Sequence, residues 1–155
     1  MGILTADMRR VLDEQQLGFV ATVTPDGKPN LSPKGTTRPW DDDHITFVDI
    51  CSPQTVANLR ANPAVEINVV DPILRKGWRF KGVAEVLAGG KLYDQIEASY
   101  RARGSANPFR HIVLVKVTEA AEIWSPSYDL GKTEAEIAAQ WEQKRDEMRA
   151  RREGG

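Results

Sequence analysis

Residues 19–32 read FVATVTPDGKPNLS, and this stretch decides the fold class. Its first six residues are mostly β-branched or apolar, a composition that favours an extended strand. The Asp26-Gly27 pair that follows is a strong signal for a tight turn between antiparallel strands. The stretch therefore predicts a β-hairpin whose returning strand begins near Asn30 and runs toward Thr37.

Working outward from this hairpin, four more segments are typical of strands and four are typical of helices. Gly82 interrupts one strand and indicates a bulge or a close approach of another backbone. The run at 65–70 is mostly apolar, which predicts burial on both faces. The expected strands are 44–50, 65–70, 78–87 and 111–117 (extending toward 124), and the expected helices begin at Thr5, Ser52, Lys91 and Thr133. Six strands with short helices between them predict the α+β class, as an antiparallel barrel with peripheral helices.

Length and composition limit the number of domains and the class of binding partner. The 155 residues suit one domain, with the barrel at about 17–124 and a C-terminal helix at about 133–152. Lys and Arg number 21 against 22 Asp and Glu, so charge gives no reason to expect nucleic acid or a membrane as partner. One cysteine and two histidines are too few for a zinc set. Without a signal-like or membrane-spanning run, we expect a soluble, cytoplasmic protein.

The sequence contains no ready-made catalytic motif, so no catalytic residue is assigned. Asp41-Asp42-Asp43 are adjacent and point in different directions, which favours a solvated turn over a metal site. Ser52-Pro53 begins a helix whose first free amides, at Gln54 and Thr55, suit a phosphate group. The alternative is that Ser52 merely caps its own helix.

Two further features are candidates for binding an anionic, planar ligand. Pro33 to Thr37 combines a strand interruption with Lys34, Gly35 and the hydroxyl of Thr36, although Pro and Lys can equally protect an edge strand. Arg79 and Lys81 share one face of the fifth strand, where two cations are usually solvated. Neither feature is decisive by itself.

Taken in order, three stretches resemble a known family. They are FVATV before Asp26-Gly27, then SPQTVANLRANP at 52–63, then GWRFKG at 77–82. Their succession resembles the pyridoxamine 5′-phosphate oxidase-like family of FMN-binding split barrels.

The resemblance implies a six-stranded antiparallel split barrel, a homodimer, and one FMN in each of two grooves at the subunit interface. It implies that the helix start at Ser52 holds the FMN phosphate and that Pro33 to Thr37 lies along the isoalloxazine ring. It also places Asp49 and Ile50 at the edge of that ring.

Departures from the family pattern limit the expected reaction. Pro53 and Gln54 stand where the oxidase carries Arg and Lys, and Ser32 and Thr37 replace two further cations. The phosphate charge would then have to be met by Lys34, Arg79 or Lys81, together with the helix start at Ser52. The C-terminal part lacks a set of residues that would bind the pyridoxal phosphate substrate, so oxidation of pyridoxamine phosphate is not expected.

The expected protein is therefore an FMN-binding oxidoreductase that passes hydride or electrons from a reduced donor to a small organic acceptor. Trp124, Tyr128 and Trp141 are candidates to line the substrate side across the dimer, or simply to pack against the barrel. Two alternatives stay open: a reductase that uses the deazaflavin coenzyme F420, and a protein that binds flavin or haem without catalysis.

Overall fold

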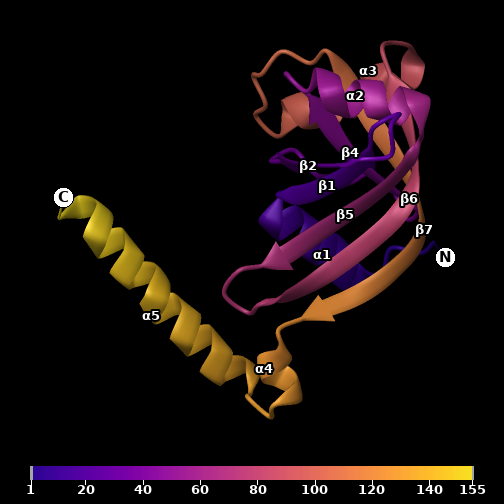
Figure 1. Ribbon diagram of the computed structural model, residues 1–155. Coiled ribbons are helices and arrows are strands. Elements are labelled where there is room, and N and C mark those ends of the chain that lie inside the picture. Colours follow the sequence, from indigo (N-terminus) through magenta and orange to yellow (C-terminus); the bar gives the residue numbers. More distant parts are fainter. Residues whose placement is uncertain (1, 155) are drawn as a thin grey trace.

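Seven antiparallel strands form one strongly curled sheet in the computed structural model, which describes residues 2–154 (Figure 1). The sheet order is β2-β1-β5-β6-β7-β4-β3. The strands are β1 (Gly18–Val23), β2 (Pro29–Lys34), β3 (Arg38–Pro39), β4 (His44–Asp49), β5 (Ala64–Asp71), β6 (Lys76–Leu87) and β7 (His111–Trp124). The expected α+β split barrel is confirmed, with the two-residue β3 added to the six predicted strands.

The predicted hairpin is the β1–β2 pair. Val23 pairs with Pro29, and Gly27 at the tip has a φ of 81°, a left-handed conformation that glycine adopts without strain. The returning strand is shorter than predicted, because β2 ends at Lys34 and residues 35–37 form a turn.

The sheet is not closed by backbone pairing, because β2 and β3 are its two edges. These edges are consecutive in the chain, so the turn at 35–37 spans the opening of the barrel. Side chains hold the turn in place: the Val48 amide donates to Thr36 Oγ1 at 2.9 Å, and the Tyr100 hydroxyl donates to the Thr36 carbonyl at 2.6 Å. The sheet is thus a split barrel whose two edge strands are joined by a connecting turn.

The barrel interior is filled by apolar side chains from most strands and from α1 (Ala6–Gln15). Thr5 caps α1 in a capping box with Met8. The expectation that β5 is buried on both faces is wrong, because Val65, Ile67 and Val69 point inward while alternate residues are partly or fully exposed. Antiparallel sheets commonly expose one face in this way.

Two helices cover one end of the barrel, as Figure 1 shows. They are α2 (Pro53–Ala61) and α3 (Lys91–Ala102). Ile96 and Tyr100 of α3 pack in a second apolar cluster with residues of β4 and β7, including Val48 and Ile112.

The long β6–β7 pair confirms the role predicted for Gly82. The register of the two strands shifts between Lys81 and Gly82. A Cβ at position 82 would overlap the carbonyl oxygen of Lys116, so only glycine fits without movement of the backbone.

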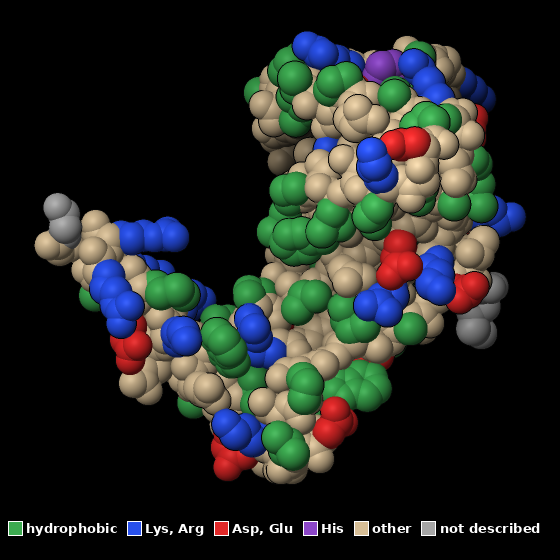
Figure 2. Space-filling view, viewed as in Figure 1, with side chains coloured by type: hydrophobic (Ala, Val, Ile, Leu, Met, Phe, Trp, Pro, Cys, Tyr) green, Lys and Arg blue, Asp and Glu red, His purple; other side chains and the backbone are tan. Residues whose placement is uncertain are grey.

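The chain ends in α4 (Pro126–Asp129), which the sequence did not predict, and α5 (Glu134–Glu153), which it did. Only Ile137 of α5 is buried, and the helix projects from the barrel as an arm (Figure 1). Figure 2 shows the open angle between this arm and the barrel, with Lys and Arg side chains along the arm. Between residues 2 and 154, no helix combines the length and apolar character that crossing a bilayer requires.

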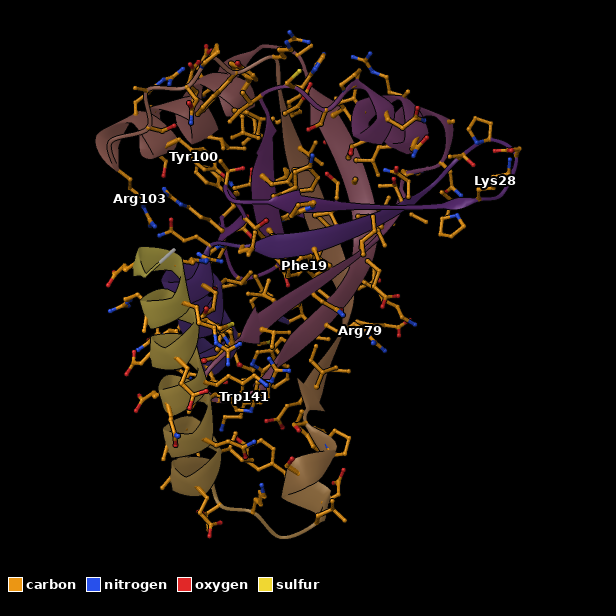
Figure 3. The ribbon with its side chains drawn as sticks, turned by 60° about the vertical axis from the view of Figure 1, so that its left-hand side comes forward. Phe19, Lys28, Arg79, Tyr100, Arg103 and Trp141 are labelled. Atoms are coloured by element: carbon orange, nitrogen blue, oxygen red, sulfur yellow. The ribbon has the colours of Figure 1, made fainter. Side chains whose placement is uncertain are left out.

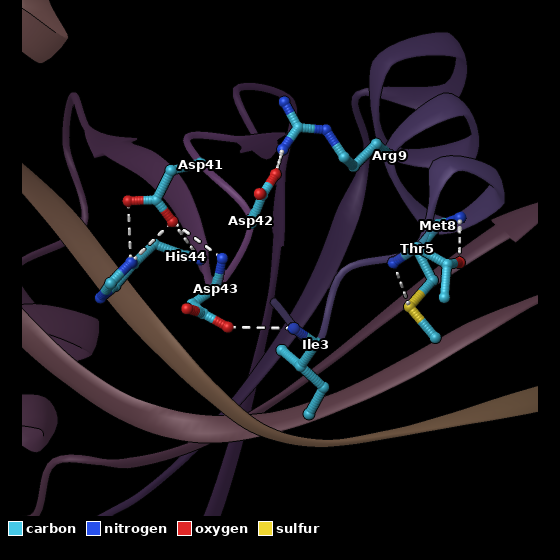
Figure 4. Close-up of polar contacts among 8 residues, drawn as sticks. All are labelled: Ile3, Thr5, Met8, Arg9, Asp41, Asp42, Asp43 and His44. Carbon is cyan, nitrogen blue, oxygen red and sulfur yellow. Dashed lines mark hydrogen bonds and ion pairs between the residues drawn. The ribbon is translucent and has the colours of Figure 1, made fainter. Parts of the chain in front are cut away.

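The Asp41–Asp43 turn is more than a solvated turn, since each carboxylate has a partner (Figure 4). Asp41 contacts His44 Nδ1 at 2.8 Å, Asp42 pairs with Arg9 at 2.7 Å, and Asp43 accepts from the Ile3 amide at 3.0 Å. The turn thus fastens the N-terminal segment and α1 to the sheet. No cluster of metal-ligating side chains is found among residues 2–154.

Candidate functional site

The turn after β2 and the loop from β4 to α2 enclose a pocket of about 340 Å³. This volume lies within the range of small-molecule sites. Six of the residues that the sequence singled out line this pocket, together with Val48 and Asn107. The six are Pro33, Lys34, Gly35, Thr36, Ile50 and Ser52.

Lys34 places a buried cation at this pocket. The residue is 7% exposed, and its ammonium donates a hydrogen bond to Ser52 Oγ. Burial lowers the pKa of Lys34, and the negative charge of Asp49 opposes this effect only in part. An ammonium has three donors, and its one side-chain partner among residues 2–154 is a neutral hydroxyl. The arrangement is therefore suited to an incoming anion.

The start of α2 adds a second feature that favours an anion. Ser52 is at the N-cap position, but its side chain makes no capping hydrogen bond. The alternative that Ser52 merely caps its own helix is thus wrong, because its oxygen accepts from Lys34 instead. The amides of Gln54 and Thr55 are left without partners inside the helix, next to the positive end of its dipole.

Asp49 lies beneath the pocket and holds the loop that carries Ser52. The residue is 2% exposed, so its carboxylate needs hydrogen-bond partners. Oδ1 accepts from the Ser52 amide at 2.6 Å, and Oδ2 contacts His111 Nδ1 at 2.8 Å. Asp49 therefore supports the site, while the neighbouring Ile50 lines it.

Three more predicted residues lie near the pocket without lining it. Thr37 is fully buried and donates to the Lys34 carbonyl at 2.9 Å, which fixes the turn. Gln54 donates to Asn58 Oδ1 at 2.7 Å within α2, and Thr55 is buried at 3% exposure. Any contribution of Gln54 and Thr55 to the pocket comes from their backbone amides.

Arg79 and Lys81 are not brought to this pocket within one chain. Both are on the outer face of β6, where Arg79 pairs with Glu66 at 2.9 Å and Lys81 with Glu119 at 3.8 Å. Figure 3 shows Arg79 well apart from Tyr100, which contacts the turn at the pocket. Their presence in a groove shared by two copies stays a prediction.

The aromatic residues of the C-terminal part pack locally. The Tyr128 hydroxyl donates to the Leu74 carbonyl at 2.7 Å, and the guanidinium of Arg75 is 3.8 Å from the ring centroid of Trp141. Trp124 donates to Asp129 Oδ1 at 3.0 Å and is half exposed. Within one chain, these residues attach α4 and α5 to the turn between β5 and β6.

The sequence did not single out Asn107 and Val48 as pocket residues, nor His111 and Tyr100 as supports. Asn107 precedes a proline in the loop between α3 and β7, which looks like any exposed connection. The contact of His111 with Asp49 spans 62 residues. No local pattern in one sequence reports such a contact. A prediction that the strands at 44–50 and 111–117 pair with each other would have brought the two residues together.

The chain matches one family model along most of its length. Residues 4–141 match the family described as pyridoxamine 5′-phosphate oxidase. No curated protein matches this chain.

Solved structures share this fold. HupZ from Group A Streptococcus is 29% identical, with a TM-score of 0.71 over 79% of this chain and 96% of that chain. An F420 reductase is 25% identical, with a TM-score of 0.58 over 76% of this chain and 98% of that chain. An FMN-binding protein from Syntrophomonas wolfei is 17% identical, with a TM-score of 0.67 over 79% of this chain and 87% of that chain, a likeness that shows the fold alone. With the family match covering residues 4–141, the chain belongs to the pyridoxamine 5′-phosphate oxidase family.

Proposed function

We propose that this protein is an FMN-binding flavoprotein and that its Lys34–Ser52 pocket binds the phosphate of FMN. The single observation that carries the proposal is the buried ammonium of Lys34, which has a neutral hydroxyl as its side-chain partner at the uncapped start of α2. A buried cation without a directly bonded counterion is costly, and a phosphate oxygen relieves that cost.

The residues present fit the phosphate end of such a cofactor. Lys34 would donate charge-assisted hydrogen bonds, and the Ser52 hydroxyl would add a neutral one. The first-turn amides of α2 would contribute donors and the helix dipole. This set carries one cation, fewer than the oxidase itself uses, so we expect weaker retention of the cofactor than in that enzyme.

The turn at 35–37 would lie along the ring of the cofactor. Gly35 lines the pocket and is exposed, and no atom approaches the space where a Cβ would stand, so the backbone there is open to a planar group. The flavin supplies the redox chemistry when bound, and the chain supplies position, hydrogen-bond donors and shelter from water. We propose that a reduced donor and then a small organic acceptor bind at this site. We also propose that the protein is a homodimer, in which the second subunit completes each cofactor-binding groove.

The visible spectrum of the freshly purified protein tests the cofactor, and mass analysis of whatever heat releases identifies it. We expect a flavin absorption band and the mass of FMN. A colourless protein that binds no added FMN would contradict the proposal. Steady-state turnover with reduced nicotinamide and a panel of acceptors then tests the oxidoreductase function.

A second candidate cofactor is the deazaflavin F420, because the chain is 25% identical to an F420 reductase. The mass of the released molecule distinguishes the two cofactors. A flavin-containing protein without turnover would instead support the non-catalytic alternative, in which the chain stores or senses flavin. Haem in place of flavin would be evident from its distinct absorption spectrum.

A further inference from the structure

A chain of polar contacts runs from the protein surface to the floor of the candidate pocket. The exposed Arg60 of α2 contacts His111 Nε2 at 3.2 Å, and His111 Nδ1 contacts Asp49 Oδ2 at 2.8 Å. Asp49 Oδ1 accepts from the amide of Ser52, whose hydroxyl accepts from Lys34. Five residues from β2, β4, α2, β7 and the loop before α2 are thus joined in one network.

The donors and acceptors of this network assign the tautomer of a neutral His111 ring. A guanidinium only donates, so Nε2 of His111 must accept from Arg60. The ring proton is therefore on Nδ1, and it is donated to the carboxylate of Asp49. His111 lies opposite Asp49 in the β4–β7 register, so the two backbones hold the pair together.

We infer that His111 is a positioning residue for the bound phosphate, acting through Asp49 and Ser52. Without the imidazole, one carboxylate oxygen of Asp49 loses its hydrogen-bond donor. Because Asp49 is only 2% exposed, this unsatisfied buried acceptor costs free energy. The carboxylate then turns toward other donors and releases the Ser52 amide. Ser52 is part of the loop before α2 and also contacts Lys34. The Ser52 hydroxyl and the Lys34 ammonium, which are the two proposed phosphate donors, therefore lose their alignment. This inference rests on the proposed function of the pocket.

The experiment compares the affinities for FMN and for riboflavin, which differ only by the phosphate. The full chain, freed of bound cofactor, is titrated with each compound in the wild type and in four variants. We expect His111→Ala to weaken FMN binding about tenfold, equivalent to about 1.4 kcal/mol, while riboflavin affinity stays unchanged. His111→Asn keeps an N–H donor for Asp49 and should restore most of the FMN affinity. The FMN affinity of Arg60→Ala should lie between those of His111→Ala and the wild type.

His44→Ala is the matched control, because His44 contacts Asp41 on another turn and should leave both affinities unchanged. Equal FMN affinity in His111→Ala and the wild type would overturn the inference while leaving the proposed function intact. A loss of both affinities that His111→Asn does not restore would also overturn it, since it marks a merely structural role. A wild type that binds neither compound, or binds both equally, would refute the proposed phosphate site itself.

Discussion

At the scale of single residues, Lys34 is the most informative position in this protein. Strand positions next to a barrel opening are usually apolar when buried, and a lysine is almost never buried without a partner. Within the described part of the chain, the ammonium of Lys34 forms a side-chain hydrogen bond only with the Ser52 hydroxyl, and the charge of Asp49 acts on it without a direct hydrogen bond. This arrangement costs stability in the free protein, and a bound anion would recover it.

Replacement of this lysine should therefore separate affinity from folding. We expect Lys34→Ala to weaken FMN binding by between about 10-fold and about 150-fold, because one charge-assisted hydrogen bond is worth about 1.5–3 kcal/mol. Isothermal titration measures the effect. Lys28→Ala is the control, since Lys28 is exposed on the β1–β2 turn and pairs with Asp26. Unchanged affinity in Lys34→Ala would refute a contact with the phosphate.

The lowered pKa of Lys34 also predicts how pH acts on the site. Burial places this pKa below the ordinary 10.5, so the folded lysine releases its proton at a pH where the unfolded one still holds it. Stability of the free protein therefore rises with pH in that window, because the unfolded state binds more protons. FMN affinity should fall in the same window, as the ammonium is lost.

Titrations at increasing alkaline pH test this prediction, with Lys34→Arg as comparison. The guanidinium stays charged throughout, so the decline in affinity below the ordinary lysine pKa of 10.5 should disappear in that variant. A decline of equal size in both proteins would assign the effect to another group.

At the scale of elements, the sequence was most informative where a local signal has one structural meaning. Asp26-Gly27 predicted the hairpin, Thr5 and Thr133 predicted two helix starts, and Gly82 predicted the β6 irregularity. Each of these signals acts within a few residues. The expectation for β5 fails because it rests on overall apolar composition and not on alternation. Glu66 and Asn68 lie between the buried Val65, Ile67 and Val69, a pattern that indicates one buried face.

Part of the candidate site was predictable because it too depends on local sequence signals. Residues 33–37 and 52–55 are two local irregularities, and each is recognisable from its own sequence, whereas Ile50 follows only from the family resemblance. That they meet depends on β2 and β4 lying on either side of the barrel opening. The contacts of Asp49 with His111 and of Lys34 with Ser52 join distant segments, which one sequence does not report. Arg79 and Lys81 were also candidates, and within one chain they extend from the outer face of β6.

The bulge in β6 gives a prediction about element stability. Gly82→Ala should destabilise the protein by about 1–3 kcal/mol, because the added Cβ overlaps the Lys116 carbonyl and contacts the Val115 side chain. Urea unfolding measures the change. Gly89→Ala is the matched control, since nothing lies within 4 Å of the place its added methyl group would take and its φ is not left-handed. Equal midpoints for the two variants would show that β6 and β7 can separate at the bulge without cost.

At the scale of the whole molecule, ligand binding should stabilise the fold as a unit. The pocket is formed by the turn after β2, the end of β4, the loop before α2 and the loop after α3, so occupation ties together both sides of the barrel opening. FMN at 100 times its Kd should add about 2.7 kcal/mol to the free energy of unfolding. Thermal unfolding with and without FMN measures this. An unchanged midpoint at saturating FMN would contradict binding to the native state.

The central claim is that the Lys34–Ser52 pocket recognises the phosphate of a flavin. The most direct measurement is the ratio of the affinities for FMN and riboflavin in the wild-type protein, obtained by titration of the cofactor-free chain. We expect FMN to bind at least about tenfold more tightly, the ratio that follows from one charge-assisted hydrogen bond of about 1.5 kcal/mol or more. Equal affinity for the two compounds would contradict the claim.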